Sequence, residues 1–192
     1  MLEAYVKKSF SLQYKSTIGA DFLSKIIHIG NDDITANIWD TAGQEKLTNS
    51  LSRQFYRGSD ACIIVFDITD KSSFTEIEKW LDAFLMQSAS RVKNIQAIPT
   101  ILVGNKVDLN DKRLISKAMA LEFVKMNGMC EYFETSAKEL NGVDEAFNYA
   151  IKKAVELLPQ MALNMNSPPS LIGSFSTLIN EEKKPSPKGC SC

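Results

Sequence analysis

Residues 100–108 read TILVGNKVD, an apolar run followed at once by Asn105, Lys106 and Asp108. A short run that is apolar at consecutive positions is typical of a strand covered on both faces in a parallel sheet. Polar side chains directly after such a strand lie at its carboxyl end, the edge where open α/β sheets bind ligands. The stretch therefore predicts an α/β fold with a ligand site beside residues 105–108.

Other β-rich runs accompany the Thr100–Val103 strand: Phe22–Ile29, Ile34–Trp39, Ala61–Phe66 and Glu131–Glu134. Helical patterns separate the later runs, and this alternation predicts a mostly parallel sheet with helices on both faces. The first two runs are joined by Gly30-Asn31-Asp32, which predicts an antiparallel hairpin at one edge of the sheet.

Three helices are predicted from apolar spacing and end signals. The first has an apolar stripe between residues 74 and 85 and is expected to begin with the capping box Ser73-x-x-Glu76. The second runs from about Ser116 to Met126 and ends at Asn127-Gly128. The third follows Asn141-Gly142 and carries apolar residues on one side.

The composition is that of a globular domain with a tail. The chain has 192 residues, 44% of them hydrophobic, and a net charge of -1, which gives no electrostatic footprint for nucleic acid. Five of the six prolines, with many serines, lie after residue 158. Residues 1–158 are therefore expected to form one domain and residues 159–192 a flexible tail.

Cysteine usage and apolar runs bear on the compartment. Cys62 and Cys130 lie in contexts typical of buried small hydrophobic residues, whereas Cys190 and Cys192 end the chain. This pattern favours the reducing cytosol over a disulfide framework. No signal-peptide core is present, and the apolar runs are too short to span a bilayer. Any membrane attachment is expected to be covalent or through a partner.

Three further motifs stand at strand ends: YKSTIGADF at 14–22, WDTAGQE at 39–45 and TSAK at 135–138. Each has an ordinary explanation when taken alone. Asp40 suits a turn at a strand end, Gln44 a solvated loop, and Thr17 a β-branched position entering a strand. In this order along the chain, together with NKVD, the motifs favour a single ligand site.

With these motifs, and with YVKKSF, FYRG, GNKVDL and YFETSAK, the chain resembles the Rab family of small GTPases, in its late-endosome and vacuole branch. The resemblance extends from Tyr5 to about Leu158. Lys46-Leu47 departs from the Arg-Phe usual in Rabs, which bears on regulator and effector contacts there and not on the family. The resemblance implies a P-loop-type G domain that hydrolyses GTP to GDP. It also implies a switch in vesicle traffic to late endosomes, lysosomes or the vacuole.

For the guanine base, the resemblance implies binding by Asn105, Lys106 and Asp108 and by Ser136, Ala137 and Lys138. The Asp108 carboxylate would accept two hydrogen bonds from the guanine edge, which adenine does not offer. The stems of Lys106 and Lys138 would form flat walls against the base, and the Ala137 N–H would meet O6.

For the phosphates, the resemblance implies Mg²⁺ and the loops around Thr17 and Gly43. Thr17 would supply a hydroxyl to Mg²⁺, and Asp40 would act on the ion through water. The Gly43 N–H would meet the γ-phosphate, and Gln44 would orient the attacking water as the catalytic residue. Both loops would serve as switches that the γ-phosphate orders.

Partner surfaces are also implied. Ile18, Phe22, Trp39 and Phe55 match the positions that effectors read, although ordinary packing explains the aromatic residues equally well. The C-x-C ending implies prenylation of Cys190 and Cys192, hence a lipid anchor on the cytoplasmic side of endomembranes and a cytosolic pool. The partners implied are an exchange factor, an activating protein, effectors, a prenylation escort and a membrane-extraction protein.

The phosphate-binding loop of this family, G-x-x-x-x-G-K-[S/T], is not found: none of the nine glycines precedes a lysine. The resemblance implies that this loop, the first and central strand and most of the first helix would lie upstream of Met1. Losing the loop's charge-assisted bonds would cost on the order of 10 kcal/mol, so the chain as written is not expected to retain GTP. Two strands would also face each other with unpaired backbone groups.

Three hypotheses follow from this pattern. The first is a regulatory GTPase whose sequence has lost its N-terminal part, since the downstream nucleotide residues are all present. The second is a nucleotide-free, Rab-like binding module that presents its switch and tail surfaces to partners. The third is a non-functional fragment that does not fold.

Overall fold

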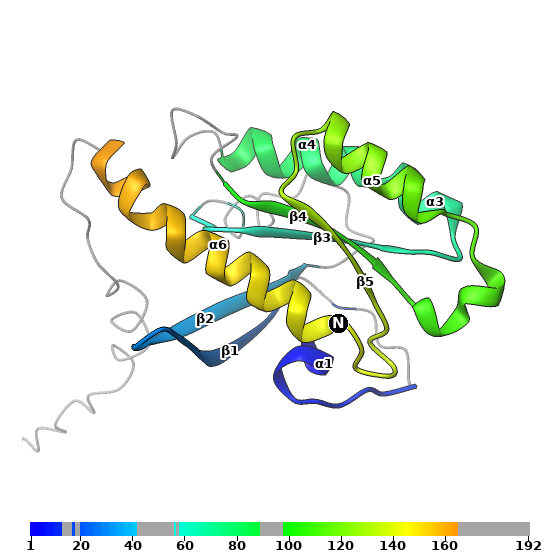
Figure 1. Ribbon diagram of the computed structural model, residues 1–192, viewed down its shortest axis with the longest axis horizontal. Coiled ribbons are helices and arrows are strands. Elements are labelled where there is room, and N and C mark those ends of the chain that lie inside the picture. Colours follow the sequence, from blue (N-terminus) through cyan, green and yellow to red (C-terminus); the bar gives the residue numbers. More distant parts are fainter. Residues whose placement is uncertain (13–16, 18–19, 42–55, 57, 89–97, 165–192) are drawn as a thin grey trace, which may run out of the picture.

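The computed structural model describes residues 1–12, 17, 20–41, 56, 58–88 and 98–164 (Figure 1). For residue 87 and residues 158–164 the description covers the backbone alone. In chain order the elements are α1 (Leu2–Val6), β1 (Ala20–Ile29), β2 (Asp32–Thr41), β3 (Cys62–Asp67), α3 (Lys71–Thr75), α4 (Ile77–Ser88), β4 (Thr100–Asn105), the 3-10 helix η2 (Val107–Lys112), α5 (Lys117–Met126), β5 (Glu131–Thr135) and α6 (Val143–Asn164).

The strands form two sheets. β3, β4 and β5 are parallel in that order, with Cys62 opposite Thr100 and Ile101 opposite Glu131. β1 and β2 form the predicted antiparallel hairpin, and Gly30 adopts the positive φ of 62° that its tight turn requires. The α/β class is confirmed. Within the described residues, however, β2 and β3 belong to different sheets.

Helices cover both faces of the parallel sheet, as predicted (Figure 1). One face packs against α3, α4 and α5 through a buried cluster that includes Phe66, Leu102 and Tyr132. The other face packs against α6, where Ala146 and Ala150 contact Ile101 and Val103. This sandwich explains why β4 is buried along nearly its whole length and reads as a continuous apolar run.

Helix α1 joins the hairpin to the parallel sheet. Tyr5 is 0% exposed, stacks on Phe147 of α6 at 4.3 Å between ring centroids, and donates its hydroxyl to Asn148 Oδ1 at 2.7 Å. Its cluster also includes Ile38 of β2 and Ile63 of β3. Side-chain packing therefore connects these two strands where no backbone ladder does in the described part of the chain.

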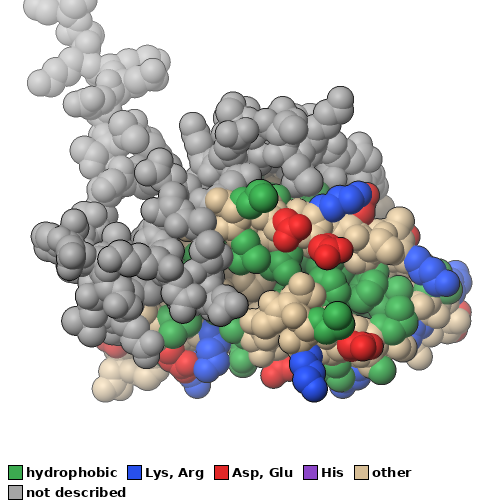
Figure 2. Space-filling model, turned by 90° about the horizontal axis from the view of Figure 1, so that it is seen from above, with side chains coloured by type: hydrophobic (Ala, Val, Ile, Leu, Met, Phe, Trp, Pro, Cys, Tyr) green, Lys and Arg blue, Asp and Glu red, His purple; other side chains and the backbone are tan. Residues whose placement is uncertain are grey.

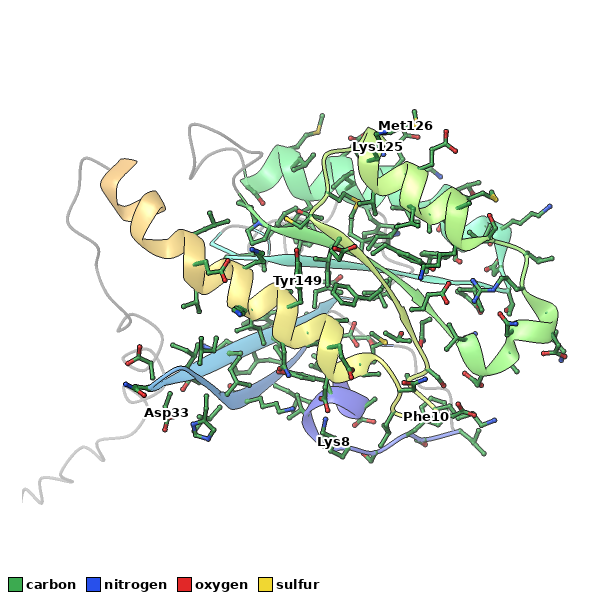
Figure 3. The ribbon with its side chains drawn as sticks, in the orientation of Figure 1. Lys8, Phe10, Asp33, Lys125, Met126 and Tyr149 are labelled. Atoms are coloured by element: carbon green, nitrogen blue, oxygen red, sulfur yellow. The ribbon has the colours of Figure 1, made fainter. Side chains whose placement is uncertain are left out.

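The hairpin is also tied to α1 by charge. Lys25 Nζ donates to the Tyr5 carbonyl at 2.9 Å and lies 3.7 Å from the centre of the Tyr5 ring. The same ammonium lies 3.7 Å from Asp144 at the start of α6, which also pairs with Lys8. Lys8 lies beside α1 at this end of the molecule (Figure 3). Lys25 of β1 and Lys8, which follows α1, thus meet at one acidic side chain of α6.

The predicted start of the first helix was wrong. α3 begins at Lys71, because Asp70 is the N-cap and accepts from the Ser72 N–H at 2.8 Å. The Ser73 hydroxyl accepts instead from the Asp67 N–H at 3.0 Å and so fixes the end of β3. Glu76 is the C-cap of α3, and α4 starts at Ile77.

The other two helices follow their predicted starts. α5 has Ser116 as its N-cap, which accepts from the Met119 N–H at 3.2 Å, and it ends at Met126 with Asn127 as its C-cap, before Gly128 at φ 63°. α6 starts after Gly142 and continues past Pro159 to Asn164, beyond the expected domain end at residue 158.

The two cysteines in the described part of the chain differ. Cys62 is half-buried, and burial raises the pKa of its thiol to about 12. Cys130 is exposed, so its predicted burial was wrong. It precedes β5, the outer strand of the parallel sheet as described, and lies outside the packed layers.

Gly142 provides a test of the backbone before α6. Its φ is +69°, and an added Cβ would lie 2.3 Å from the Glu134 carbonyl oxygen. We expect Gly142→Ala to lower the free energy of unfolding by about 2–4 kcal/mol, because left-handed strain adds to the clash. Gly30→Ala is the matched control, since Gly30 has φ +62° and open space around it. Urea unfolding measures both, and equal losses would contradict the role of the clash.

Candidate functional site

The NKVD segment turns sharply where β4 ends. Asn105 is the last residue of β4, and Lys106 adopts a left-handed conformation with φ 70°. The Leu109 N–H then donates to the Lys106 carbonyl at 2.9 Å, which closes the turn into η2. This turn brings Asp108 back toward the carboxyl edge of the sheet, as the sequence predicted.

Asp108 is anchored by the TSAK segment. Ser136, which is fully buried, donates its hydroxyl to Asp108 Oδ1 at 2.6 Å and accepts from the Glu139 N–H at 3.1 Å. The other carboxylate oxygen lies 3.9 Å from Lys138 Nζ. The Asp108 side chain is 7% exposed and that of Lys138 56% exposed. A nearly buried carboxylate is thus held through its Oδ1 oxygen by the Ser136 hydroxyl.

Asn105 links the same two segments. Its Oδ1 accepts from the Ala137 N–H at 3.0 Å and from Thr135 Oγ1 at 3.2 Å. The Ala137 N–H, predicted to meet O6 of guanine, therefore donates to a side chain of the protein in this structure. The structure brings together Asn105, Lys106, Asp108, Ser136, Ala137 and Lys138, all predicted to bind the base.

Asp67 is a site residue that the sequence reasoning missed. Its Oδ2 lies 2.6 Å from Lys106 Nζ, and its Oδ1 accepts from the N–H and the hydroxyl of Thr69 at 2.8 and 2.7 Å. Burial raises the Asp67 pKa, but the hydrogen bonds from Lys106 and Thr69 outweigh burial and leave the pKa lowered. The ion pair holds the Lys106 ammonium and thereby restrains its stem.

A signal for Asp67 was present in the sequence. Asp67 follows the apolar run 61–66 as Asn105 follows the run at 100–104, and the two residues are partners in the β3–β4 register. Polar residues that end neighbouring parallel strands meet at one edge. The rule that identified Asn105 applied equally to Asp67.

The predicted phosphate side is only partly described. Asp40 lies opposite Asp21 in the hairpin, one residue before the end of β2. The Asp40 pKa is raised, mainly by burial. The positive charge of the Met1 amine opposes this shift, and the negative charge of Asp21 adds to it. Asp40 lines a hollow of about 170 Å³ with Asp21 and residues of α1 and β1. Thr17 is half-buried.

The predicted metal site has few described members. Within the ranges that the structure describes, no cluster of three or more Asp, Glu, His or Cys side chains could hold an ion. Mg²⁺ prefers few protein ligands together with phosphate and water, so the Thr17 hydroxyl and the Asp40 carboxylate fit its chemistry. The remaining predicted residues, Ile18, Gly43, Gln44, Phe55, Cys190 and Cys192, lie outside the described residues.

Phe22 and Trp39 form an exposed aromatic pair. Their ring centroids are 4.6 Å apart across the hairpin, and the residues are 46% and 39% exposed. Their partial exposure does not fit core packing, but their contact is the packing between paired strands that the ordinary alternative includes, so their reading by effectors stays a prediction.

The surface and the helices limit other kinds of site. The face over α4 and α5 mixes hydrophobic, acidic and basic side chains with no large basic patch among its described residues (Figure 2). No described helix combines the length and the apolar character needed to cross a membrane.

The lowered Asp67 pKa gives a pH test. The carboxylate contributes stability above its ordinary pKa of 3.8, and that contribution is lost as pH falls through the lower folded-state value. We expect Asp67→Asn to cost about 1 kcal/mol at neutral pH, and the difference from the unsubstituted chain to shrink below about pH 4. Urea unfolding between about pH 3 and 7 checks this. Asp82→Asn, an exposed change on α4, controls for the loss of one charge, and a pH-independent difference would contradict the ion pair.

Comparison with known proteins places the chain in a family. The Ras family matches residues 1–156. The chain is 40% identical over 193 aligned residues to the Ypt/Rab-type GTPase ypt7 of Schizosaccharomyces pombe, covering 100% of this chain and 89% of the relative. It is 39% identical to the Ras-related protein Rab7 of Drosophila melanogaster, with the same coverage. It is 41% identical over 157 residues to the Ras-related protein Rab-7a of Dictyostelium discoideum, covering 82% of this chain and 76% of the relative. The chain belongs to the Ras family of small GTPases and, within it, to the Rab7-like group.

Proposed function

We propose that this protein is a GTP/GDP switch that regulates vesicle traffic to the late endosome, lysosome or vacuole. The observation that carries the proposal is the nearly buried Asp108 carboxylate, anchored by Ser136 beside the Asn105–Ala137 hydrogen bond. The Rab7-like relatives support the branch of traffic.

Base selection follows from the chemistry of Asp108. A carboxylate accepts hydrogen bonds and donates none, so it suits the N1–H and exocyclic amine of guanine. Adenine presents no such pair of donors and would leave a buried charge unpaired, at a cost of about 1–3 kcal/mol or more. Because Ser136 holds Oδ1, the carboxylate is oriented before the base arrives.

On the phosphate side we propose Thr17 as the residue that supplies its hydroxyl to Mg²⁺, and Asp40 as one that acts through water. When bound, Mg²⁺ neutralises charge on the phosphates. Gly43 would donate its N–H to the γ-phosphate, and Gln44 would orient the water that attacks it, giving GDP and phosphate. Exchange factors, activating proteins and effectors would act at the loops around these residues. The exposed Phe22–Trp39 pair, with Ile18 and Phe55, would form the effector surface.

A second candidate function rests on the sequence itself. None of the nine glycines precedes a lysine, so the 192 residues contain no Gly-Lys phosphate loop. We propose as the alternative that this chain is a nucleotide-free binding module. Its described residues form packed layers, which favours this candidate over a fragment that does not fold.

Asp108→Asn tests base recognition. An Asn side chain donates to the 2-oxo group of xanthine but loses the charge that attracts the guanine donors. We expect GDP affinity to fall about a hundredfold or more and the xanthosine diphosphate affinity to rise, measured by calorimetry with and without Mg²⁺. Asp111→Asn, an exposed change in the same 3-10 helix, is the matched control.

The unsubstituted chain decides between the two candidates in this experiment. GDP binding that Asp108→Asn removes supports the switch. A cooperatively folded chain that binds no guanine nucleotide would contradict the switch and support the binding module. ADP is the reference for unspecific nucleotide binding.

We propose that Cys190 and Cys192, in the tail expected after α6, are lipidated. Two prenyl chains give stable membrane anchoring where one gives marginal binding. We expect the chain made in eukaryotic cells to gain the mass of two isoprenoids and to float with liposomes. Cys190→Ser with Cys192→Ser should remove both properties. Cys130→Ser controls for an exposed cysteine within the folded domain, and an unchanged mass in the double variant would refute the assignment.

A further inference from the structure

A second polar network lies beside the proposed base site and includes none of the residues proposed to bind the nucleotide. The Arg113 guanidinium meets the Glu134 carboxylate through two contacts, Nη1 to Oε1 at 2.8 Å and Nη2 to Oε2 at 3.2 Å. The side chains are 21% and 29% exposed. Paired planar groups of this kind fix direction as well as distance.

Arg113 holds the segment that carries Asp108. It is the C-cap of η2, and its Nε donates to Asn110 Oδ1 at 2.8 Å while its backbone N–H donates to the Asn110 carbonyl at 3.2 Å. Nη1 also reaches the Ile115 carbonyl at 3.3 Å. The Arg113 side chain thus contacts residues that precede it and follow it in the chain, Asn110 and Ile115.

These contacts matter because η2 is not a regular helix. Leu109, directly after Asp108, has non-helical dihedral angles of φ -103° and ψ 34°. A kinked segment of this length has few hydrogen bonds of its own to keep a side chain in one place. The direction of the Asp108 carboxylate therefore depends on contacts made outside η2.

Glu134 holds the segment that carries Ser136 and Ala137. It lies in β5, opposite Gly104 in the β4–β5 register, and its Oε1 accepts from the Tyr132 hydroxyl at 3.1 Å. A Cβ on Gly104 would lie 2.4 Å from that hydroxyl oxygen. Gly104, the residue before Asn105, leaves the room that Tyr132 needs to reach Glu134.

We propose that Arg113 and Glu134 are positioning residues that hold the Asp108 segment in register with the Ser136–Lys138 turn and thereby set selectivity for guanine. Neither touches the base. The inference rests on the proposed function, because it concerns the same base site. Misplacing Asp108 weakens the bond to the exocyclic amine, which distinguishes guanine from hypoxanthine.

The test compares Arg113→Met, Glu134→Gln and Arg113→Lys, with affinities for GDP and inosine diphosphate measured by calorimetry. Inosine diphosphate lacks the exocyclic amine, so the affinity ratio reports how Asp108 is placed. We expect Arg113→Met and Glu134→Gln to weaken GDP binding about tenfold and to bring the ratio toward one. Arg113→Lys keeps the positive charge but loses the planar two-point contact with the carboxylate, so its affinity ratio should lie between those of the unsubstituted chain and Arg113→Met.

Lys153→Met is the matched control, because it breaks an exposed 2.8 Å pair with Glu156 on α6. Lys153→Met should leave the ratio of GDP to inosine diphosphate affinity unchanged. If the substitutions only lowered stability, that ratio would stay unchanged in Arg113→Met and Glu134→Gln as well. An unchanged GDP to inosine diphosphate ratio in both Arg113→Met and Glu134→Gln overturns the inference.

Amide hydrogen exchange in the nucleotide-free chain gives a readout that does not need binding. The Ala137 N–H, which donates to Asn105 Oδ1, should lose protection in Arg113→Met and keep it in Lys153→Met. If the unsubstituted chain binds neither nucleotide, the proposed function fails, and this exchange measurement decides the inference. Unchanged protection of Ala137 in Arg113→Met would then overturn it.

Discussion

The hydrogen bond from Ser136 to Asp108 is the interaction on which the site depends. It joins two residues that are 28 positions apart in sequence and lie just beyond the ends of two parallel strands, and it does so with a fully buried hydroxyl. Asn105 repeats the connection with the Ala137 N–H. Because β4 and β5 pair in parallel, these polar groups meet at one edge with little freedom to separate. In the proposed function, this rigidity would let a single carboxylate select the base.

Further ion pairs support that edge from both sides. Asp67 restrains Lys106 from β3, and Glu134 restrains η2 through Arg113 from β5. Each of these pairs is partly buried on at least one side, so neither resembles a freely exposed surface ion pair of small energetic value. The residues proposed to bind the base thus lie between two ion pairs, one with a partner in β3 and the other with a partner in β5.

The connection between the hairpin and the parallel sheet has a different physical basis. Tyr5 is buried against Phe147, and burial, with the charge of Asp144, raises its phenol pKa to about 12, so it remains a donor to Asn148. Lys25 adds a hydrogen bond and a cation–π contact to the same residue. Side-chain packing is less directional than a backbone ladder. Among the described residues, the hairpin, with Asp40 and the Phe22–Trp39 pair, is consequently joined to the parallel sheet by side-chain packing around α1 and not by a backbone ladder.

The sequence by itself determined the local elements and the placement of the base residues. Continuous apolar runs identified β3 and β4, Gly30 marked the hairpin turn, and Ser116 with Gly128 marked the ends of α5, because each signal acts over a few neighbouring residues. Tertiary structure decided what depends on partners distant along the chain. It left Cys130 exposed, whereas the N-cap at Asp70 instead of Ser73 is a local contact that the capping-box pattern misplaced. It also paired Asp67 with Lys106 and Arg113 with Glu134, since a charge chooses its partner by distance in space, which periodicity along the chain does not encode.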